Sequence, residues 1–392
     1  MAGTEIFDSE EVRAAVDVIE RKMIHRYGSH GARNGQYRVD EFEAAAAALA
    51  GTKYALGVSS GTAALVTAFK CVGVKPGDEV ITTPFTFIAT IEAIVACDAV
   101  PVLGDIDETL SLDPNCVEAL ISERTAAIVP VHMFGCAADM DRFTAIGAKH
   151  GIPVIEDACE VVGGTYKGRM LGSMGLCGAW SFDPNKTLTV GEGGIVLTND
   201  EELYKKMEYY HDHGHVHSRE HDRGADAKSG FGVNYRLSEI QGALGLVALR
   251  KMPMALARLR AAKAEILDAV KDTGLTPRPM NDAAGDTATH VIFLLPTAEG
   301  AKRFQSAAAE AGCQCGIIAE NTWHYAKNWQ ALEDISESDF FGTKTPSYMP
   351  EAMAASDAIL SRAVMFGLDI SMTDEAKAKM IRATEAGAKA AL

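Results

Sequence analysis

The 392-residue sequence contains no uncharged apolar run long enough to span a membrane, so we expect no membrane partner. Its first residues, Met1 to Glu11, are polar and acidic. They lack both the basic region and the apolar region of a signal peptide. The expected location is therefore the cytoplasm.

Basic residues are scarce: Lys and Arg number 37 against 53 Asp and Glu, which gives a formal net charge of −16. This balance argues against a nucleic-acid partner, because clustered cations must neutralise the phosphates of such a ligand. A small anionic ligand would have to be bound by helix N-termini and a few well-placed cations. The eight cysteines show no paired metal-ligand spacing, and buried free thiols are predicted.

Apolar runs alternate with helical patterns from Tyr54 to Asn199. This alternation predicts βαβ units and a mainly parallel sheet with helices on both faces. Beyond Lys251, strand-like runs at His290–Leu295 and Cys315–Ala319 are interspersed with helices. We therefore expect a large α/β domain at residues 1–250 and a smaller α+β C-terminal domain at residues 251–392. The strands expected in the large domain are Tyr54–Val58, Glu79–Thr83, Val100–Ile106, Ala126–Val131, Pro153–Asp157, Ala179–Phe182 and Gly194–Thr198.

Capping residues mark two helix starts. Asp8 and Glu11 are spaced as a capping box, and a second helix is expected from Ser238. The first helix continues with an apolar stripe that should pack against the rest of the protein. This stripe consists of Val12, Val16, Ile19 and Met23.

A small, polar segment, Ser59–Leu65, follows the first expected strand and leads into a helix. A Gly61-Thr62 turn at a helix start exposes backbone N–H groups to a phosphate and adds a hydroxyl, and the helix dipole favours the negative charge. An ordinary N-cap by Ser60 is the alternative interpretation.

Glu156 and Asp157 end an apolar strand at the edge that ligands occupy in open α/β sheets. A carboxylate at this edge could form a charge-assisted hydrogen bond with a ring nitrogen. Asp157 is the better candidate, because side chains alternate along a strand and Glu156 should face the other way. Two solvated carboxylates remain the alternative.

Lys186 lies in an expected turn between apolar strands, close to the glycine-rich Gly191–Gly194. Such a lysine suits a Schiff base, with an amine pKa lowered by its surroundings, although an ordinary surface lysine is possible. Phe87, just after a strand, could stack on a planar ring or belong to the core.

In order and chemistry these segments match a site for pyridoxal 5'-phosphate (PLP), and the chain resembles the DegT/DnrJ/EryC/StrS sugar aminotransferase family. That family belongs to the fold-type I PLP-dependent enzymes, which are aspartate-aminotransferase-like. The resemblance covers nearly the whole chain. Its most specific segments are Ser60–Leu65, Glu156–Ala158, Ser181–Lys186, Gly191–Gly194 and Asn234–Glu239.

The resemblance implies roles for individual residues. Lys186 matches the Schiff-base lysine and Asp157 the partner of the ring nitrogen, and these two are the expected catalytic residues. Asn234 matches an asparagine that reaches the phosphate from the neighbouring subunit, which implies a homodimer with shared active sites. The other expected cofactor-binding residues are Ser60, Gly61, Thr62, Ala63, Phe87, Glu160 and Ser181.

Glu160 departs from the family pattern, which commonly has glutamine or histidine there, near the 3' oxygen of the cofactor. An acid beside a phenolate would be repelled unless it were protonated or turned away. Its role is left open. The histidines between His211 and His217, with His221 beyond, could suit zinc or nickel, but the family has a histidine-glycine pair in this loop without a metal. No metal site is expected.

The implied reaction moves an amino group from an amino acid, with glutamate expected, to a keto- or aldehydo-sugar in cell-surface sugar or secondary-metabolite biosynthesis. Segments near Tyr27, Arg33, His211 and Asn321 resemble family members that make 8-amino-3,8-dideoxy-manno-octulosonate. The candidate substrate-binding residues are Arg26, Arg33, His213, His324 and Tyr325, although for the two arginines a solvated loop position is an equal alternative.

Other functions stay open at this point. A nucleotide-linked keto-deoxysugar or an aminocyclitol precursor could be the acceptor instead. A dehydratase or a PLP-binding regulator on the same fold is a further alternative. Lys186 argues against a dehydratase, because sugar dehydratases of the family carry histidine in its place.

Overall fold

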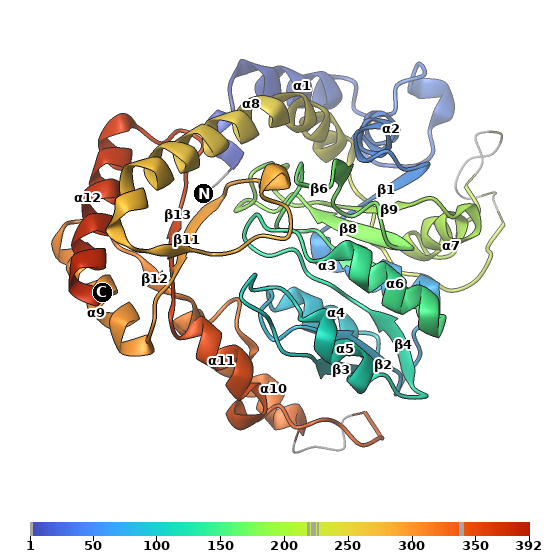
Figure 1. The fold of residues 1–392 in the computed structure, drawn as a ribbon. Helices are drawn as coiled ribbons and strands as arrows, with labels where there is room; N and C mark the ends of the chain where they lie inside the picture. The colour runs from blue at the N-terminus through green and yellow to red at the C-terminus, as the bar shows by residue number, and fades with distance from the viewer. Residues whose placement is uncertain (1–2, 218–219, 221–224, 226, 337–340) are drawn as a thin grey trace.

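The computed structural model describes residues 3–217, 220, 225, 227–336 and 341–392 (Figure 1). The helices are α1 Ser9–Glu20, α2 Arg38–Ala50, α3 Gly61–Val72, α4 Ala89–Val95, α5 Pro114–Leu120, α6 Met140–His150, α7 Glu201–His211, α8 Glu239–Val270, α9 Ala298–Glu310, α10 Gln330–Ser336, α11 Ala354–Leu360 and α12 Asp374–Ala391. The strands are β1 Tyr54–Val58, β2 Glu79–Thr82, β3 Val100–Leu103, β4 Thr125–Ile128, β5 Ile155–Asp157, β6 Thr165–Tyr166, β7 Arg169–Met170, β8 Cys177–Ser181, β9 Gly194–Thr198, β10 Thr276–Pro277, β11 His290–Leu294, β12 Gly316–Ile317 and β13 Ala363–Gly367.

The large sheet is mainly parallel, as the sequence predicts. Strands β1, β9, β8 and β5 are adjacent in that order, and β3, β2 and β4 form a parallel group. Parallel bridges from Ile128 to Val154 and from Val131 to Asp157 join the two groups. Strand β9 runs antiparallel to both neighbours, whereas β5 is parallel to β8.

The strand order brings distant segments of sequence to one edge of the sheet. Because β1, β2, β5 and β8 share one direction, the segments that follow them leave the sheet at the same edge. These segments begin at Ser59, Thr83, Ala158 and Phe182. Ligands bind at this edge in open α/β sheets.

A smaller antiparallel sheet forms the C-terminal part of the fold, with strand order β10, β11, β13, β12. Figure 1 shows α9 and α12 beside this sheet, and α8 extending from the region of α1 and α2 toward α12. Helix α8 is continuous across residue 251, where the sequence predicts the domain boundary, and it contains Pro253. The division into residues 1–250 and 251–392 stays a prediction.

Helix α1 begins as predicted, with a complete capping box between Asp8 and Glu11. The prediction that its apolar stripe packs against the rest of the protein is wrong for a single chain, because the side chains of Val12 and Ile19 are 62% and 55% exposed. The helix instead buries its other face, where Val18 is 3% exposed. An ion pair of 2.8 Å between Glu11 and Lys251 fixes α1 to α8.

In the part of the chain that the structure describes, no helix combines the length and the apolar character needed to cross a membrane.

Candidate active site

A cavity of about 610 Å³ opens at the carboxyl edge of the large sheet. Segments after β1, β2, β5 and β8 all contribute to its wall, and the C-terminal part of the chain closes it. The predicted residues that line it are Ser60, Gly61, Thr62, Phe87, Asp157, Glu160, Ser181, Lys186 and His324. The structure thus brings together most of the residues that sequence reasoning selected.

The N-terminus of α3 faces the cavity. Ser60 is its N-cap, and the Ser60 hydroxyl accepts a hydrogen bond of 3.0 Å from the N–H of Ala63. The N–H groups of Gly61 and Thr62 belong to the first turn, which has no intrahelical acceptors for them. Gly61 must be glycine, because a Cβ there would lie 2.8 Å from the Cβ of Ser181. The helix start can therefore hold a phosphate. The N–H of Ala63 already donates to the Ser60 hydroxyl, so Gly61 and Thr62 supply the open N–H groups.

Asp157 and Glu156 point to opposite sides of β5. The Asp157 carboxylate is 4% exposed and accepts hydrogen bonds from the Thr90 hydroxyl at 2.7 Å and from the Cys159 N–H at 3.1 Å. Glu156 is fully buried and accepts the N–H groups of Gly172, Met174 and Gly175 at 2.5 to 2.8 Å. Glu156 therefore fixes a turn, and Asp157 is the carboxylate that faces the cavity.

Thr90 is a residue that sequence reasoning missed. Its hydroxyl gives its hydrogen to Asp157, so the 2.6 Å contact with Thr86 must be a hydrogen bond that Thr86 donates. Thr90 thus holds one oxygen of the Asp157 carboxylate in place, and Thr86 holds Thr90. Thr86 and Thr90 are four residues apart in the sequence, but nothing in the local sequence indicates that Asp157 lies opposite Thr90.

Lys186 reaches into the cavity and forms an ion pair with Glu160. Burial lowers the pKa of the Lys186 ammonium, but the Glu160 carboxylate outweighs that effect and the pKa is raised. The expectation of a lowered lysine pKa is therefore wrong in this arrangement, because the acid that replaces the family's neutral residue contacts the amine directly. The turn is held from outside by the Gly3 N–H, which donates to the Lys186 carbonyl at 2.8 Å.

Aromatic rings form one wall of the cavity. The Phe87 ring centroid lies 5.5 Å from the Lys186 Nζ, and its ring is parallel to that of Trp323 at 6.1 Å. His324 lies 5.4 Å from Phe87. His290 also lines the cavity, and burial lowers its pKa to about 3, so that it is neutral. Neither Trp323 nor His290 was selected from sequence, although Trp323 is adjacent to the predicted His324.

The donor set fits PLP. A primary amine suits the cofactor aldehyde, a buried carboxylate suits the ring nitrogen, and a helix N-terminus with a serine cap suits the phosphate. Lys186, Asp157 and Ser60 supply these groups from three separate strand ends of one cavity.

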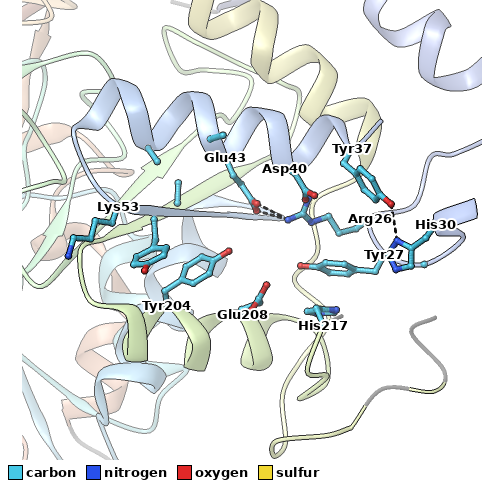
Figure 2. Close-up of a pocket in the computed structure, with 15 residues that line it drawn as sticks. Arg26, Tyr27, His30, Tyr37, Asp40, Glu43, Lys53, Tyr204, Glu208 and His217 are labelled. Atoms are coloured by element: carbon cyan, nitrogen blue, oxygen red, sulfur yellow. Dashed lines mark hydrogen bonds and ion pairs between the residues drawn. The ribbon is translucent and has the colours of Figure 1, made fainter. Parts of the chain in front are cut away.

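Arg26 does not line this cavity. It borders a second cavity of about 390 Å³ between α2 and α7 (Figure 2). Its guanidinium is 6% exposed and donates to Asp40 at 2.5 Å and to both carboxylate oxygens of Glu43 at 2.8 Å. Burial raises the pKa of Glu43 to about 7 even beside this arginine.

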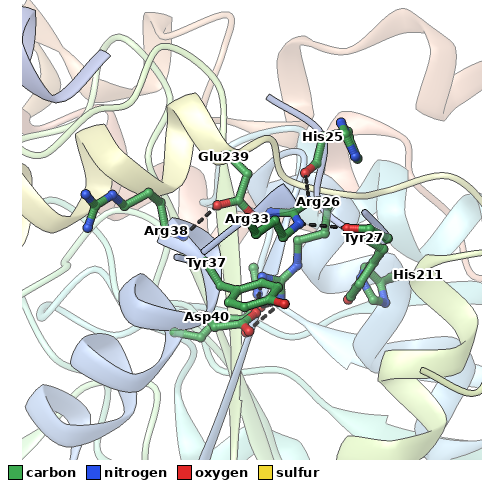
Figure 3. A network of polar contacts seen from close by, with 12 residues as sticks. His25, Arg26, Tyr27, Arg33, Tyr37, Arg38, Asp40, His211 and Glu239 are labelled. Atoms are coloured by element: carbon green, nitrogen blue, oxygen red, sulfur yellow. Dashed lines mark hydrogen bonds and ion pairs between the residues drawn. The ribbon is translucent and has the colours of Figure 1, made fainter. Parts of the chain in front are cut away.

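Arg33 is also bound by its own chain (Figure 3). It is 2% exposed, donates to the carbonyls of Gly28, at 2.7 Å, and His25, and pairs with Glu239 at 3.3 Å. Neither Arg26 nor Arg33 lines this cavity within one chain, so the role of either in binding a substrate carboxylate stays a prediction. Both arginines fix the segment between α1 and α2.

Three further predicted residues lie outside the cavity. His213 is exposed in the loop after α7. Tyr325 is fully buried in the core, and its hydroxyl donates to the Met353 carbonyl at 3.5 Å. Asn234 is exposed and lies opposite Asp212 in a backbone bridge.

The histidine-rich loop has structural contacts. His211 is buried and donates from Nδ1 to the Glu208 carbonyl at 2.6 Å, so its Nε2 accepts the Tyr27 hydroxyl at 2.9 Å. The His217 ring stacks on Tyr27 at 3.6 Å. His221 lies outside the described residues. Among the residues that are described, no group of three His, Cys, Asp or Glu side chains is arranged to hold a metal ion.

Comparison with known proteins gives a consistent result. The family model described as the DegT/DnrJ/EryC1/StrS aminotransferase family matches residues 10–384. GDP-perosamine synthase of Caulobacter vibrioides is 43% identical over 218 residues, which are 55% of this chain and 57% of that protein. UDP-2-acetamido-2-deoxy-3-oxo-D-glucuronate aminotransferase of Pseudomonas aeruginosa is 39% identical over 249 residues, 62% of this chain and 67% of that protein. The chain thus spans little more than half the length of the first of these relatives.

The fold comparison covers nearly the whole chain. An aminotransferase structure from Psychrobacter cryohalolentis superposes with a TM-score of 0.82 at 30% identity, over 96% of both chains.

Proposed function

The chain belongs to the DegT/DnrJ/EryC1/StrS aminotransferase family, and from this premise we propose that it is a PLP-dependent sugar aminotransferase. It would move an amino group from an amino acid, with glutamate expected, to the carbonyl carbon of a keto- or aldehydo-sugar. One observation carries the proposal. The Lys186 amine, the Asp157 carboxylate and the N-terminus of α3 converge on one cavity.

Each residue has a defined task. The Lys186 amine would hold the cofactor through its aldehyde and would serve as the base and acid that moves a proton at the substrate carbon. Asp157, fixed by Thr90 and the Cys159 N–H, keeps the ring nitrogen protonated. The N-terminus of α3 and the hydroxyls of Ser60 and Ser181 hold the phosphate. PLP itself supplies an electron sink for the reacting carbon.

The acceptor is a sugar, and two classes are supported by different observations. The resemblance of the Asn321–Tyr325 segment favours 3,8-dideoxy-8-oxo-manno-octulosonate. The absence of Arg26 and Arg33 from the cavity wall of one chain weakens this choice, because that substrate carries its own carboxylate. The Pseudomonas relative is named as an aminotransferase of a UDP-linked keto-sugar, and a nucleotide-linked acceptor is our second candidate.

A homodimer with shared active sites is part of the proposal. The cavity wall carries the carboxylates of Asp157, Glu160, Asp183 and Glu192, while Lys186 is the one Lys or Arg side chain among the described lining residues. A phosphate and a donor carboxylate need more hydrogen-bond donors than this wall offers. A second copy would supply donors such as Asn234, and the exposed apolar stripe of α1 offers surface for association. The cytoplasmic location stays a prediction.

Absorption spectroscopy tests the assignment of Lys186. The wild-type protein with PLP should show a visible band from the Schiff base, and glutamate should remove it by converting the cofactor to its amine form. Lys186→Ala should hold no covalent cofactor, while Lys167→Ala, a change at an exposed lysine, should behave like wild type. A wild-type protein that stays colourless after PLP is added would reject the proposal.

A further inference from the structure

We propose that Glu160 is the counter-ion of the Schiff-base nitrogen on Lys186 and that His324 positions it; this inference rests on the proposed function. Two separate sets of contacts, one around Glu160 and one around His324, support it.

The first set concerns Lys186. Its Nζ contacts the Oε1 atom of Glu160, and both side chains are largely buried, at 17% and 14% exposure. Any imine formed at this Nζ keeps its nitrogen at the end of the same lysine side chain. The carboxylate is therefore within reach of that nitrogen in the loaded enzyme. A negative charge there stabilises the protonated form of the imine over the neutral form.

The second set fixes the orientation of the His324 ring. The Oδ1 atom of Asn321 accepts the backbone N–H groups of Trp323 at 2.9 Å and His324 at 3.0 Å, which identifies this atom as the amide oxygen. The His324 Nδ1 lies 3.2 Å from the same oxygen and must donate to it. The His324 Nε2 faces the Glu160 carboxylate at 3.8 Å. The ring is therefore held by Asn321 on one side and faces Glu160 on the other.

Glu160 therefore lies between Lys186 and His324. Burial alone would raise its pKa, but Lys186 and His324 outweigh burial and hold the pKa well below its usual range. The other charged or titratable groups that face the pair are Asp157, Cys159 and His290; the pKa of the Cys159 thiol is raised by burial, and His290 is neutral. Glu160 stays ionised across the neutral range and can balance one positive charge at Lys186.

The two side chains act on the imine in different ways. The Glu160 carboxylate favours a protonated Schiff base through its charge, whereas His324 acts through the position of Glu160. Replacing Glu160 by glutamine removes the charge and keeps the shape of the side chain, so the titration of the imine reports the charge itself.

The test is a spectroscopic pH titration of the holoenzyme across the neutral and alkaline range. Glu160→Gln should lower the midpoint for loss of the protonated Schiff-base band by about one pH unit or more, and His324→Gln should lower it by less, because Glu160 then loses the side chain that positions it. Glu192→Gln is the matched control, because Glu192 lines the same cavity and makes no ion pair with Lys186 among the described contacts. Its midpoint should equal that of wild type.

Several outcomes would overturn the inference. An unchanged midpoint in Glu160→Gln would reject the counter-ion role, as would an equal shift in Glu192→Gln. An unchanged midpoint in His324→Gln would reject the positioning role of His324. If wild type itself forms no visible band with PLP, the proposed function fails. If the band forms and Glu160→Gln titrates as wild type does, this inference alone fails.

Discussion

Adjacent carboxylates at the end of β5 have different tasks. Asp157 faces the cavity and accepts hydrogen bonds from the Thr90 hydroxyl and the Cys159 N–H. Glu156 faces away and accepts three backbone N–H groups and the His132 Nε2 at 3.2 Å. Alternation along the strand separates the two so completely that substitutions should give different phenotypes.

Asp157→Asn should leave the fold intact and slow proton transfer by at least about 10²-fold, because a preorganised partner charge is lost. Single-turnover reaction with glutamate, followed by loss of the visible band, measures this rate. Glu156→Gln is the comparison: it should lower the free energy of unfolding by roughly 2 to 4 kcal/mol, because an amide cannot accept all of these donors. Near-normal turnover in Asp157→Asn would return Glu156 to consideration.

At the scale of elements, the loop after α7 is fixed to the segment before α2. The buried His211 connects the Glu208 carbonyl with the Tyr27 hydroxyl, and Tyr27 stacks on His217. Burial lowers the pKa of His211 to about 3, so the folded state holds a neutral ring that the unfolded chain would protonate near its ordinary pKa.

This histidine makes the fold sensitive to acid. Its contribution to stability is complete above the unfolded pKa of about 6.5 and is lost as the pH falls toward 3, with a slope of at most about 1.4 kcal/mol per pH unit. Urea denaturation of His211→Gln between neutral pH and about pH 5 should therefore show a shallower loss than wild type. His213→Gln, at an exposed position, should follow wild type. Equal slopes in all three proteins would contradict the assignment.

Sequence patterns predict those elements that depend on local chemistry. Strands β1 and β9 have the predicted bounds, because each is an apolar run between turn residues. Strand β13 was missed, although it lies between β11 and β12. A five-residue apolar run cannot reveal partners elsewhere in the chain, and length alone does not separate such a run from part of a helix.

The prediction of site residues also depends on local sequence. Lys186 and Asp157 could be selected because each has a distinctive local context. The ion pairs of Arg26 could not be predicted, because its partners Asp40 and Glu43 lie 14 and 17 residues further along the chain and compensate its charge only after folding. Thr90 lies 67 residues from Asp157, so their hydrogen bond is a product of sheet topology.

For the whole molecule, the shortage of hydrogen-bond donors around the cavity leads to a test of shared sites. A dimer that pairs an Asn234→Ala subunit with a Lys186→Ala subunit has one intact site if Asn234 acts across the interface. Such mixtures should recover about half of wild-type activity per dimer, because a two-fold interface places each residue type once in each site. Each parental homodimer should be weaker.

A matched control reverses the arrangement. Pairing a wild-type subunit with one that carries both substitutions leaves no intact site if Asn234 acts across the interface, and leaves one if it acts within its own subunit. Mass measurement confirms subunit exchange in both mixtures. Activity in the second mixture and none in the first would place Asn234 in its own site and remove this support for a shared one.

The position of β9 also constrains the order in which the chain can assemble during synthesis. Strand β1 pairs with β9 through the register Tyr54 to Thr198, so the ribosome must deliver residue 198 before β1 gains this neighbour. Loop closure over such a separation slows folding. Because Ser60 continues directly from β1 and a Cβ at Gly194 would lie 2.2 Å from the Ser60 carbonyl, the phosphate end of the cavity takes its final shape only after Lys186 has been synthesised. A nascent chain therefore cannot bind both the phosphate and the aldehyde end of its cofactor until β9 has paired with β1.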